Sequence, residues 1–308
     1  MYDVIIIGGG PGGVSAGIYA ARKQLKSMII AETIGGQSSV SADVQNWIGT
    51  KSIDGYGFAK MLGEHLRAYE KMIEIHEGER VTEVSEISDG GFLVKSAKGE
   101  YQTKTIIVCS GSRRKKLDVP GEKDFEGKGA MYCSICDAPM FPDKDVAVVG
   151  GGNAGLEAVI DLNPYAKKIY LLVRKNELKG DQVTQEKIKK FEKLTIIYNA
   201  VTTSIIGEKF VRAIRYKDTA SGEEKELPVD GVFIQIGALP NTEFLGNLVQ
   251  KNPIGEIILN HKTGATSKEG IYAAGDATDE VYKQNNISAG DSIKALLSAY
   301  AWLHKQEK

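Results

Sequence analysis

The sequence predicts an α/β protein, and three observations support that fold class. The chain has 308 residues, a length that suits two domains better than a single core. It is 42% hydrophobic and 26% charged, which is typical of a folded globular protein and not of a disordered one. A pattern of strand, glycine turn, helix and strand occurs twice. These features indicate two similar units, each with a parallel sheet.

The repeat is visible directly in the sequence. DVIIIGGGPGGVSAGIYAARKQLKSMIIAE begins at Asp3, and DVAVVGGGNAGLEAVIDLNPYAKKIYLLVR begins at Asp145. The two copies align without a gap as far as Glu32 and Arg174. Their apolar runs VIII and VAVV are typical of strands that are buried on both faces of a parallel sheet.

Each copy carries the pattern G-x-G-x-x-G between its first strand and its helix. The first glycine allows a tight turn, the second lets a pyrophosphate approach the backbone, and the third lets the helix pack against the strand. These glycines are Gly8, Gly10 and Gly13 in the first copy, and Gly150, Gly152 and Gly155 in the second. One such motif could be an ordinary tight turn, but two in the same context predict two bound dinucleotides.

The residue that ends the second strand of each copy suggests which dinucleotides these are. An acidic residue there can bond a free ribose hydroxyl, whereas an arginine accommodates a 2′-phosphate. Glu32 therefore suits FAD, and Arg174 with Lys175 suits NADPH. The alternative is that the two basic residues are solvated loop charges. One arginine sets phosphate preference only loosely, so NADH stays possible.

Two of the three cysteines, Cys133 and Cys136, lie in the stretch YCSICDAPMF. They could form half of a metal site, a static disulfide or a disulfide that opens and closes. Cys109 and the four histidines show no paired spacing, which disfavours zinc. A C-x-x-C turn can hold two sulfurs at bonding distance and lower a thiol pKa, which favours reversible exchange. Cys109 lies in the apolar stretch TIIVCSG and is expected to be buried.

Asp137 directly follows the second cysteine. A carboxyl beside a reacting sulfur can give or take the thiol proton if its surroundings raise its pKa toward working pH. The alternative is a helix N-cap, a position that favours aspartate, and the two roles are compatible.

The charges and the hydropathy exclude several classes of partner. Lys and Arg total 39 against 40 Asp and Glu, so no basic field exists for nucleic acid. No apolar run reaches the ~20 residues of a membrane helix. The start MYDVIIIGGG has no secretory signal, so a cytoplasmic location is expected.

The basic run in SRRKKL, residues 113–116, is either a solvated surface or a steering patch for an acidic partner.

Taken together, these motifs resemble those of the low-molecular-weight thioredoxin reductase family, and they are closer still to the flavoprotein subunit of alkyl hydroperoxide reductase. The resemblance covers nearly the whole chain. Besides both glycine fingerprints and CSICD, it includes IGGQ, VQNWIG, SGS, IGALPNT, GIYAAGDATD and YKQNNISAGDSIKALLSA. It implies that FAD also contacts Gly36, Gln37, Asn46, Gly275, Asp276 and Gln284, and that Lys179 joins Arg174 and Lys175 at the NADPH phosphate.

The resemblance also implies a domain order. Two Rossmann-like, three-layer dinucleotide-binding domains are expected, with the second inserted into the first. Residues 1–115 begin the FAD domain, residues 116–243 form the NAD(P)H domain with the redox disulfide, and residues 244–308 complete the FAD domain. Links at LDVPGE and GALPNT are expected to act as a hinge about which the NAD(P)H domain rotates. A homodimer and a final helix from about Ser288 are further expectations.

The implied reaction is disulfide reduction. Electrons pass from NADPH through FAD to Cys133–Cys136, and then to a thioredoxin-, glutaredoxin- or peroxiredoxin-type protein disulfide. Cys136 would face the flavin, Cys133 would attack the substrate and Asp137 would serve as acid and base. An NADH-preferring reductase of a peroxidase-linked partner, a dithiol oxidase and a ferredoxin-fed reductase are alternatives on the same fold.

The chain departs from the family pattern at three places. Ala138 replaces the glycine that usually follows C-x-x-C-D. The segment VRKNELK keeps only part of the basic phosphate motif, while Val173 stands where NADH-using relatives tend to have an acid. The sequence begins at the FAD domain, without the thioredoxin-like extension of the hydroperoxide branch. A partner of that kind is therefore expected to be a separate protein.

Overall fold

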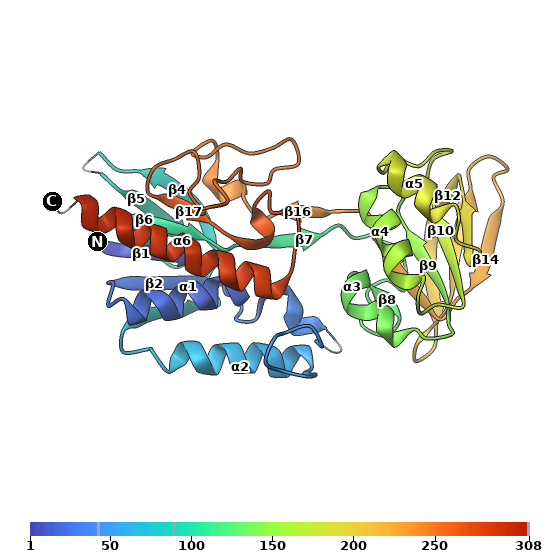
Figure 1. Cartoon of the computed structure of the whole chain (residues 1–308), viewed down its shortest axis with the longest axis horizontal. Coiled ribbons are helices and arrows are strands. Elements are labelled where there is room, and N and C mark those ends of the chain that lie inside the picture. The colour runs from blue at the N-terminus through green and yellow to red at the C-terminus, as the bar shows by residue number, and fades with distance from the viewer. Residues whose placement is uncertain (42–43, 89, 307–308) are drawn as a thin grey trace. The chain divides into compact units, whose positions relative to one another are not determined.

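The computed structural model describes residues 1–41, 44–88 and 90–306. It divides into two compact units, which are coloured by residue number in Figure 1. Unit 1 comprises Met1–Arg113 and Leu239–Lys308, and unit 2 comprises Arg114–Ala238. Both units contain a parallel sheet with helices packed on it, so the predicted α/β fold class is confirmed.

Unit 1 is built on a seven-stranded sheet in the order β3-β2-β1-β6-β5-β4, with β17 also paired to β6. The strands β1, β2, β3, β6 and β17 are parallel, whereas β4 and β5 form an antiparallel extension. The strand bounds are β1 Tyr2–Ile7, β2 Ser27–Ala31, β3 Ile73–Glu77, β4 Val81–Glu86, β5 Phe92–Ser96, β6 Glu100–Val108 and β17 Ile271–Ala273.

Three helices cover one face of this sheet, and they lie together on one side of it in Figure 1. They are α1 Pro11–Arg22, α2 Gly55–Arg67 and α6 Asn285–Gln306. Side chains alternate along β1, so Val4 and Ile6 join the helices while Ile5 and Ile7 join the core on the other face. Short 3-10 turns complete the unit: η1 Gly36–Val40, η3 Glu243–Leu245 and η4 Gly275–Ala277.

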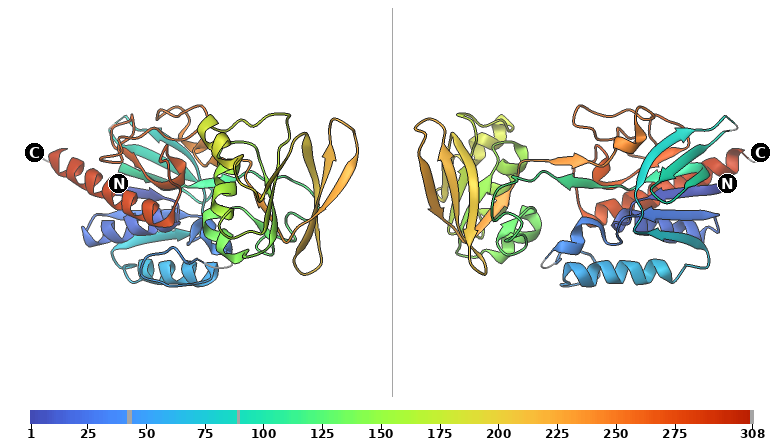
Figure 2. Two further views of the ribbon diagram at one scale, coloured as in Figure 1. Left: turned by 45° about the vertical axis from the view of Figure 1, so that its right-hand side comes forward. Right: turned by 180° about the vertical axis from the view of Figure 1, so that it is seen from behind.

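Unit 2 has three layers, which Figure 2 shows from two sides. The middle layer is a parallel sheet in the order β11-β10-β9-β15-β8, with β8 Ala130–Met131, β9 Asp145–Val149, β10 Lys168–Leu172, β11 Leu194–Ile197 and β15 Gly231–Ile234. On one face lie α3 Ser134–Asp137, η2 Ala138–Met140, α4 Asn153–Leu162 and α5 Gln182–Ile188. On the other lies an antiparallel sheet of β12 Ala200–Gly207, β13 Val211–Asp218 and β14 Glu224–Pro228.

The chain passes between the units inside two short paired strands, β7 Ser112–Arg114 and β16 Ala238–Pro240. The expectation that LDVPGE is a link is wrong, because this segment lies within unit 2. There the Glu122 carboxylate accepts the N–H groups of Leu117 at 3.0 Å and Asp118 at 2.8 Å. The changes of unit fall at 113/114 and 238/239, whereas the sequence placed them at 115/116 and 243/244.

The final helix also differs from its expected start. It begins at Asn285 and not near Ser288, because the N–H of Ser288 already donates to the carbonyl of Gln284 at 2.9 Å. Neither this helix nor any other in the described ranges is both long and apolar enough to span a membrane.

Candidate functional site

The first glycine turn connects β1 to α1. Gly8 has φ +111°, and a Cβ there would lie 2.2 Å from the carbonyl oxygen of Cys109. A Cβ at Gly13 would lie 1.8 Å from the carbonyl oxygen of Gly8. At Gly10, by contrast, a Cβ would meet only the Gly36 Cα, at 3.9 Å. The first and third glycines therefore serve packing, and the second leaves room for a ligand.

The second turn, between β9 and α4, repeats this arrangement. Gly150 has φ +134°, and a Cβ there would lie 2.2 Å from the carbonyl oxygen of Gln235. A Cβ at Gly155 would lie 1.9 Å from the carbonyl oxygen of Gly150. At Gly152 it would meet nothing within 4 Å. Both turns thus have the shape that a pyrophosphate needs at a helix N-terminus.

The loop after β2 returns to the first turn. Gly35 donates its N–H to the Gly9 carbonyl at 2.8 Å, and a Cβ at Gly36 would lie 3.0 Å from the Gly10 Cα. The Gln37 amide donates to the Ser112 hydroxyl at 3.3 Å. The structure therefore brings Gly36, predicted to contact FAD, against the glycine turn, and it holds Gln37 near the start of β7.

The remaining residues that were predicted to contact FAD lie around the start of α6. The Asn46 amide donates to Gln284 Oε1 at 3.1 Å, and the Asn286 amide donates to the Asn46 carbonyl at 2.6 Å. A Cβ at Gly275 would lie 2.4 Å from Ser288 Oγ, and one at Gly12 would lie 2.7 Å from the same oxygen. The predicted residues Gly275 and Asp276, both in η4, are therefore next to α6 and the glycine turn.

Glu32 follows β2 and is exposed, as a residue that bonds a ribose must be. Its Oε1 lies 3.8 Å from the Arg80 guanidinium. Sequence reasoning missed both Arg80 and Asn286. Arg80 belongs to no motif, and its proximity to Glu32 follows from the pairing of β2 with β3.

In unit 2, Arg174, Lys175 and Lys179 are all exposed after β10. The N–H groups of Lys179 and Gly180 donate to the Gly151 carbonyl at 2.7 and 3.2 Å. The predicted basic residues are therefore on a loop that folds back onto the second glycine turn. This arrangement is compatible with a phosphorylated ribose, since the three charges are free to meet solvent or ligand.

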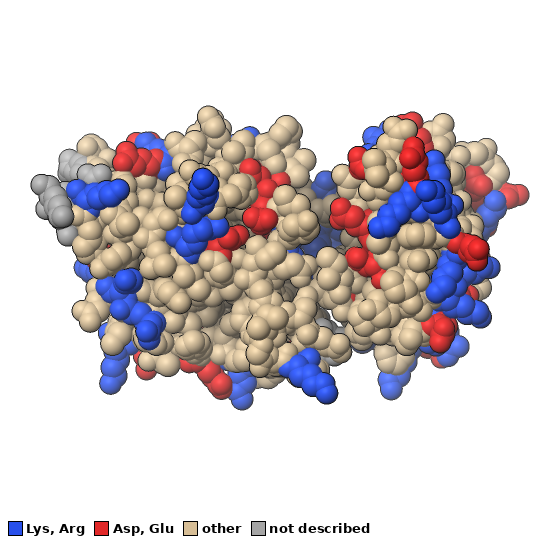
Figure 3. Space-filling view, in the orientation of Figure 1, with Lys and Arg blue, Asp and Glu red and all other residues tan. Residues whose placement is uncertain are grey.

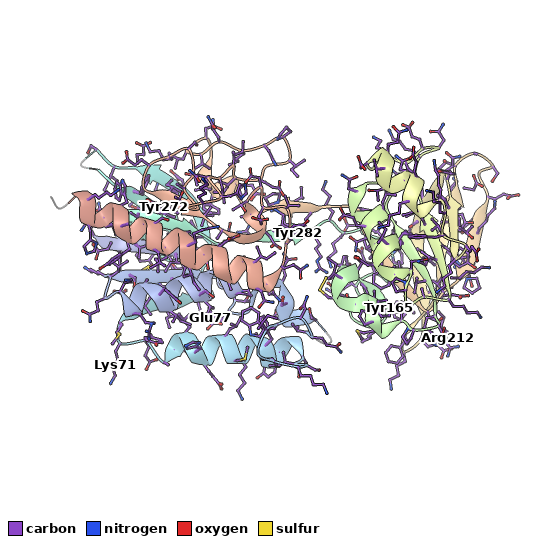
Figure 4. All side chains as sticks on the ribbon, in the orientation of Figure 1. Lys71, Glu77, Tyr165, Arg212, Tyr272 and Tyr282 are labelled. Carbon is purple, nitrogen blue, oxygen red and sulfur yellow. A yellow bond between two sulfur atoms is a disulfide. The ribbon has the colours of Figure 1, made fainter. Side chains whose placement is uncertain are left out.

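The predicted cysteine pair forms a disulfide, drawn as a yellow sulfur–sulfur bond in Figure 4. The Cα atoms of Cys133 and Cys136 are 5.3 Å apart, and both residues are partly exposed. Cys133 is the N-cap of α3, and its Sγ accepts the N–H of Cys136 at 3.3 Å. Cys109 is free and buried as predicted, and burial raises the pKa of its thiol to about 12. Cys109 is therefore held as a neutral thiol.

Asp137 is only 8% exposed. Burial raises the pKa of its carboxyl to about 6, although the charge of Arg114 and a hydrogen bond from the Cys133 backbone act in the opposite direction. Asp137 precedes η2, but its side chain makes no capping hydrogen bond. Ala138, the departure from the family pattern, has φ −54° and ψ −39°, so alanine is accommodated without strain.

The basic run 113–116 is exposed but has specific partners. Arg113 donates to Glu243 at 2.6 Å, and Lys116 pairs with Glu126 at 2.9 Å. Lys116 also donates to the hydroxyl of Tyr132, the residue before the disulfide, at 3.0 Å. On the face drawn in Figure 3, basic and acidic side chains are interspersed over both units. The run is therefore at least partly structural.

Two nucleotide-type glycine turns and a disulfide backed by a buried carboxyl define the class: flavoproteins that couple a nicotinamide nucleotide to a redox-active disulfide. Residues 2–291 match the family of pyridine nucleotide-disulphide oxidoreductases. The chain belongs to this family. Membership implies FAD and a nicotinamide cofactor, and the two open glycine turns fit both groups.

Curated relatives cover nearly the whole length of this chain but are longer. It is 40% identical over 307 residues to a protein of Bacillus subtilis (strain 168) named NADH dehydrogenase. The match covers 98% of this chain and 58% of that protein. It is also 40% identical over 302 residues to a protein of Staphylococcus epidermidis (strain ATCC 35984) that is named as a subunit of alkyl hydroperoxide reductase, covering 98% and 59%. The chain thus spans somewhat over half the length of these relatives.

A solved structure matches over the full length of both chains. The thioredoxin reductase from Streptococcus pyogenes MGAS5005 has a TM-score of 0.91 and 31% sequence identity, with 99% of each chain covered. This match, together with the family, confirms the predicted resemblance and the pair of Rossmann-like domains.

Proposed function

We propose that this protein is an NAD(P)H-dependent flavoprotein disulfide reductase that delivers electrons through Cys133–Cys136 to a thioredoxin-like protein disulfide. The observation that carries the proposal is the disulfide itself, which is partly exposed and followed by a buried carboxyl with a pKa of about 6. A static cross-link has no need of such a proton-exchanging neighbour.

The site residues have distinct roles in this proposal. FAD bound in unit 1 supplies the two-electron relay between nicotinamide and disulfide. Gly8, Gly10, Gly13 and Glu32 hold its adenosine diphosphate half, while the flavin half would lie by Gly36, Gln37, Asn46, Gly275, Asp276 and Gln284. Unit 2 binds the nicotinamide nucleotide at Gly150, Gly152 and Gly155.

The chemistry at the sulfurs follows from their order. In the reduced protein, Cys133 as thiolate attacks the partner disulfide, which forms a mixed disulfide and expels one partner thiolate. Cys136 then attacks Cys133 Sγ, closes the internal disulfide and expels the second partner thiolate. Asp137 takes the Cys136 proton at this step and returns a proton when the internal disulfide is next opened. A carboxyl with a pKa of about 6 can do both near neutral pH.

NADPH is the proposed donor because Arg174, Lys175 and Lys179 are exposed on the loop that returns to Gly151. The second candidate is an NADH-preferring reductase of a peroxiredoxin-type partner. It is favoured by the 40% identity to one protein named NADH dehydrogenase and to another named as a subunit of alkyl hydroperoxide reductase. A cytosolic location is part of the proposal, because NAD(P)H and reduced thiols are maintained in the cytosol. A homodimer, which the family resemblance implies, completes it.

Anaerobic mixing tests the proposal. The purified yellow protein is mixed with NADPH, NADH or buffer, and bleaching of the flavin is followed by absorbance. Rapid bleaching by NADPH supports the proposal, faster bleaching by NADH supports the second candidate, and no bleaching by either overturns both. Cys133→Ser and Cys136→Ser are each expected to abolish reduction of a thioredoxin disulfide, and undiminished turnover in either variant would refute the role of the disulfide.

A further inference from the structure

A hydrogen bond ties the redox loop to the helix of the second glycine turn. Ser134, the residue after Cys133, is 8% exposed, and its Oγ donates to Asp161 Oδ2 at 2.7 Å. Asp161 is in the last turn of α4, whose first residue is Asn153. Both residues belong to unit 2, so this contact is internal to one compact unit.

The Ser134 hydroxyl is not needed for the local structure of α3. The N-cap position is held by Cys133, whose sulfur already accepts the N–H of Cys136. The turn η2 that follows α3 packs on α4 through its own apolar contacts, in a cluster that includes Ala138, Leu156 and Val159. The hydroxyl is therefore committed to the carboxylate alone.

The carboxylate of Asp161, in turn, has a single strong partner. In the ranges that the structure describes, Ser134 is the one hydrogen-bond donor to the Asp161 side chain, and no lysine, arginine or histidine forms an ion pair with it. A neutral hydroxyl does not cancel the negative charge. The other charged groups associated with the loop are Asp137 and Arg114.

We infer that Ser134 and Asp161 form a positioning pair that fixes the Cys133 end of the redox loop on α4 and holds a negative charge beside it. Opening the disulfide adds two electrons and two protons, and it creates a thiol at Cys133 that ionises in order to react. A carboxylate held by the residue that follows Cys133 disfavours the thiolate. At a pH where the Cys133 thiol ionises, the pair therefore shifts the equilibrium toward the disulfide and makes the dithiol a stronger reductant for its partner.

The inference rests on the proposed function only in requiring that the disulfide be redox-active. Its test uses the full-length holoprotein equilibrated at about pH 9, where a thiol with a pKa of about 8.5 ionises, with reduced and oxidised dithiothreitol and without nicotinamide. In this exchange dithiothreitol loses two electrons and two protons and becomes the cyclic disulfide, while Cys133–Cys136 becomes a dithiol. The fraction of dithiol is read by alkylation and mass spectrometry.

Four variants separate charge from structure. Asp161→Asn removes the charge but keeps a hydrogen-bond acceptor, and it is expected to raise the equilibrium constant for reduction about fivefold or more. Ser134→Ala frees the carboxylate and is expected to shift the constant by more than twofold, whereas Ser134→Thr keeps the hydroxyl and should stay within about twofold of the wild type. Glu192→Gln changes an exposed acid in the turn before β11 of the same unit and is the control, expected to have no effect.

The outcomes are distinct. Asp161→Asn and Ser134→Ala both within twofold of the wild type would overturn the inference, as would an equal shift in Glu192→Gln. Thermal unfolding of each variant checks that the fold is intact. A disulfide that equilibrates with dithiothreitol as expected, in a protein whose flavin is not bleached by NADPH or NADH, would refute the proposed function while leaving the positioning pair supported.

Discussion

The turn after β1 and the turn after β9 have almost the same backbone but different surroundings. In both, a Cβ at the third glycine would lie less than 2 Å from the carbonyl oxygen of the first, and the middle glycine is open. The strand ends differ, however. Glu32 lies near Arg80 in unit 1, whereas Arg174 and Lys175 follow the strand in unit 2. The backbone is therefore suited to a pyrophosphate in both units, and the side chains at the strand ends are left to select the nucleotide.

The units also differ in the hydrogen bonds that they provide to a buried carboxyl, and therefore in its pKa. Glu79 in unit 1 is 2% exposed and accepts hydrogen bonds from Ser96 and Tyr101, with His76 Nδ1 at 3.0 Å. Burial opposes its ionisation, yet these bonds lower the pKa of Glu79 below its ordinary value. Among the described residues, Asp137 in unit 2 has no such set of donors, and burial raises its pKa. A carboxylate with a full set of donors fits a structural role, and one whose pKa is raised fits proton transfer.

The largest expected effect comes from filling the third glycine of each turn. Gly13→Ala and Gly155→Ala place a methyl group 1.8 and 1.9 Å from a backbone oxygen, so each helix must shift away from its strand. Such overpacking typically costs about 1–3 kcal/mol or more, so we expect about a hundredfold loss of binding in the affected unit. Gly13→Ala should lose FAD, measured as flavin per protein. Gly155→Ala should retain FAD and lose nicotinamide binding in a calorimetric titration.

Gly152→Ala is the matched control, because a Cβ there meets nothing in the protein within 4 Å. It should leave the melting temperature unchanged and weaken only the nicotinamide nucleotide. If Gly155→Ala released the flavin instead, the assignment of one nucleotide to each unit would fail.

Local patterns explain which features the sequence could predict. The two glycine turns, the cysteine pair and Asp137 lie within short motifs whose geometry depends on neighbouring residues, so the sequence alone identifies them. The Ser134–Asp161 bond and the Arg80–Glu32 pair join residues from different elements. No spacing rule encodes such contacts, because they depend on how strands and helices pack. The short strands β7 and β16 likewise have no periodic signal.

The second largest expected effect concerns the buried carboxyls Asp137 and Glu79, whose variants should change stability in opposite directions with pH. The folded-state pKa of Asp137, about 6, exceeds its ordinary value of 3.8. Its contribution to stability is therefore fully present below about pH 4 and is lost as the pH rises through 6. Asp137→Asn avoids this loss, so at pH 8 it should be more stable than the wild type by up to about 3 kcal/mol in urea unfolding. The difference should shrink as the pH falls from about 6 to about 4 and be small at lower pH.

Glu79→Gln should behave in the opposite way. The lowered pKa of Glu79 gives stability above its ordinary value of 4.5, and this is lost as the pH falls. The glutamine variant should therefore be less stable than the wild type at pH 7, by about 1–3 kcal/mol. If Asp137→Asn were destabilising at pH 8 in the same manner, the distinction between the two carboxyls would be wrong.

A smaller effect is expected at the strand end of unit 2. Arg174→Ala should weaken NADPH binding about tenfold, because a charge-assisted bond to the 2′-phosphate is worth about 1.5–3 kcal/mol and is partly screened here. NADH binding should be unchanged, since that nucleotide has no 2′-phosphate. Both dissociation constants are measured by titration. Lys209→Ala, an exposed charge in the turn between β12 and β13, is the control. Equal weakening of both nucleotides would remove Arg174 from phosphate recognition.

The smallest effect is expected at the strand end of unit 1. Arg80 and Glu32 are 3.8 Å apart, and both side chains are more than 60% exposed. Exposed pairs of this kind contribute about 0.2–1 kcal/mol at most, so a double-mutant cycle with Arg80→Gln and Glu32→Gln in the flavin-free protein should give a coupling near zero. A coupling well above about 1 kcal/mol would mean that the fold itself engages Glu32. The carboxylate would then be unavailable to a ribose, and the two strand ends would no longer differ as nucleotide-selecting positions.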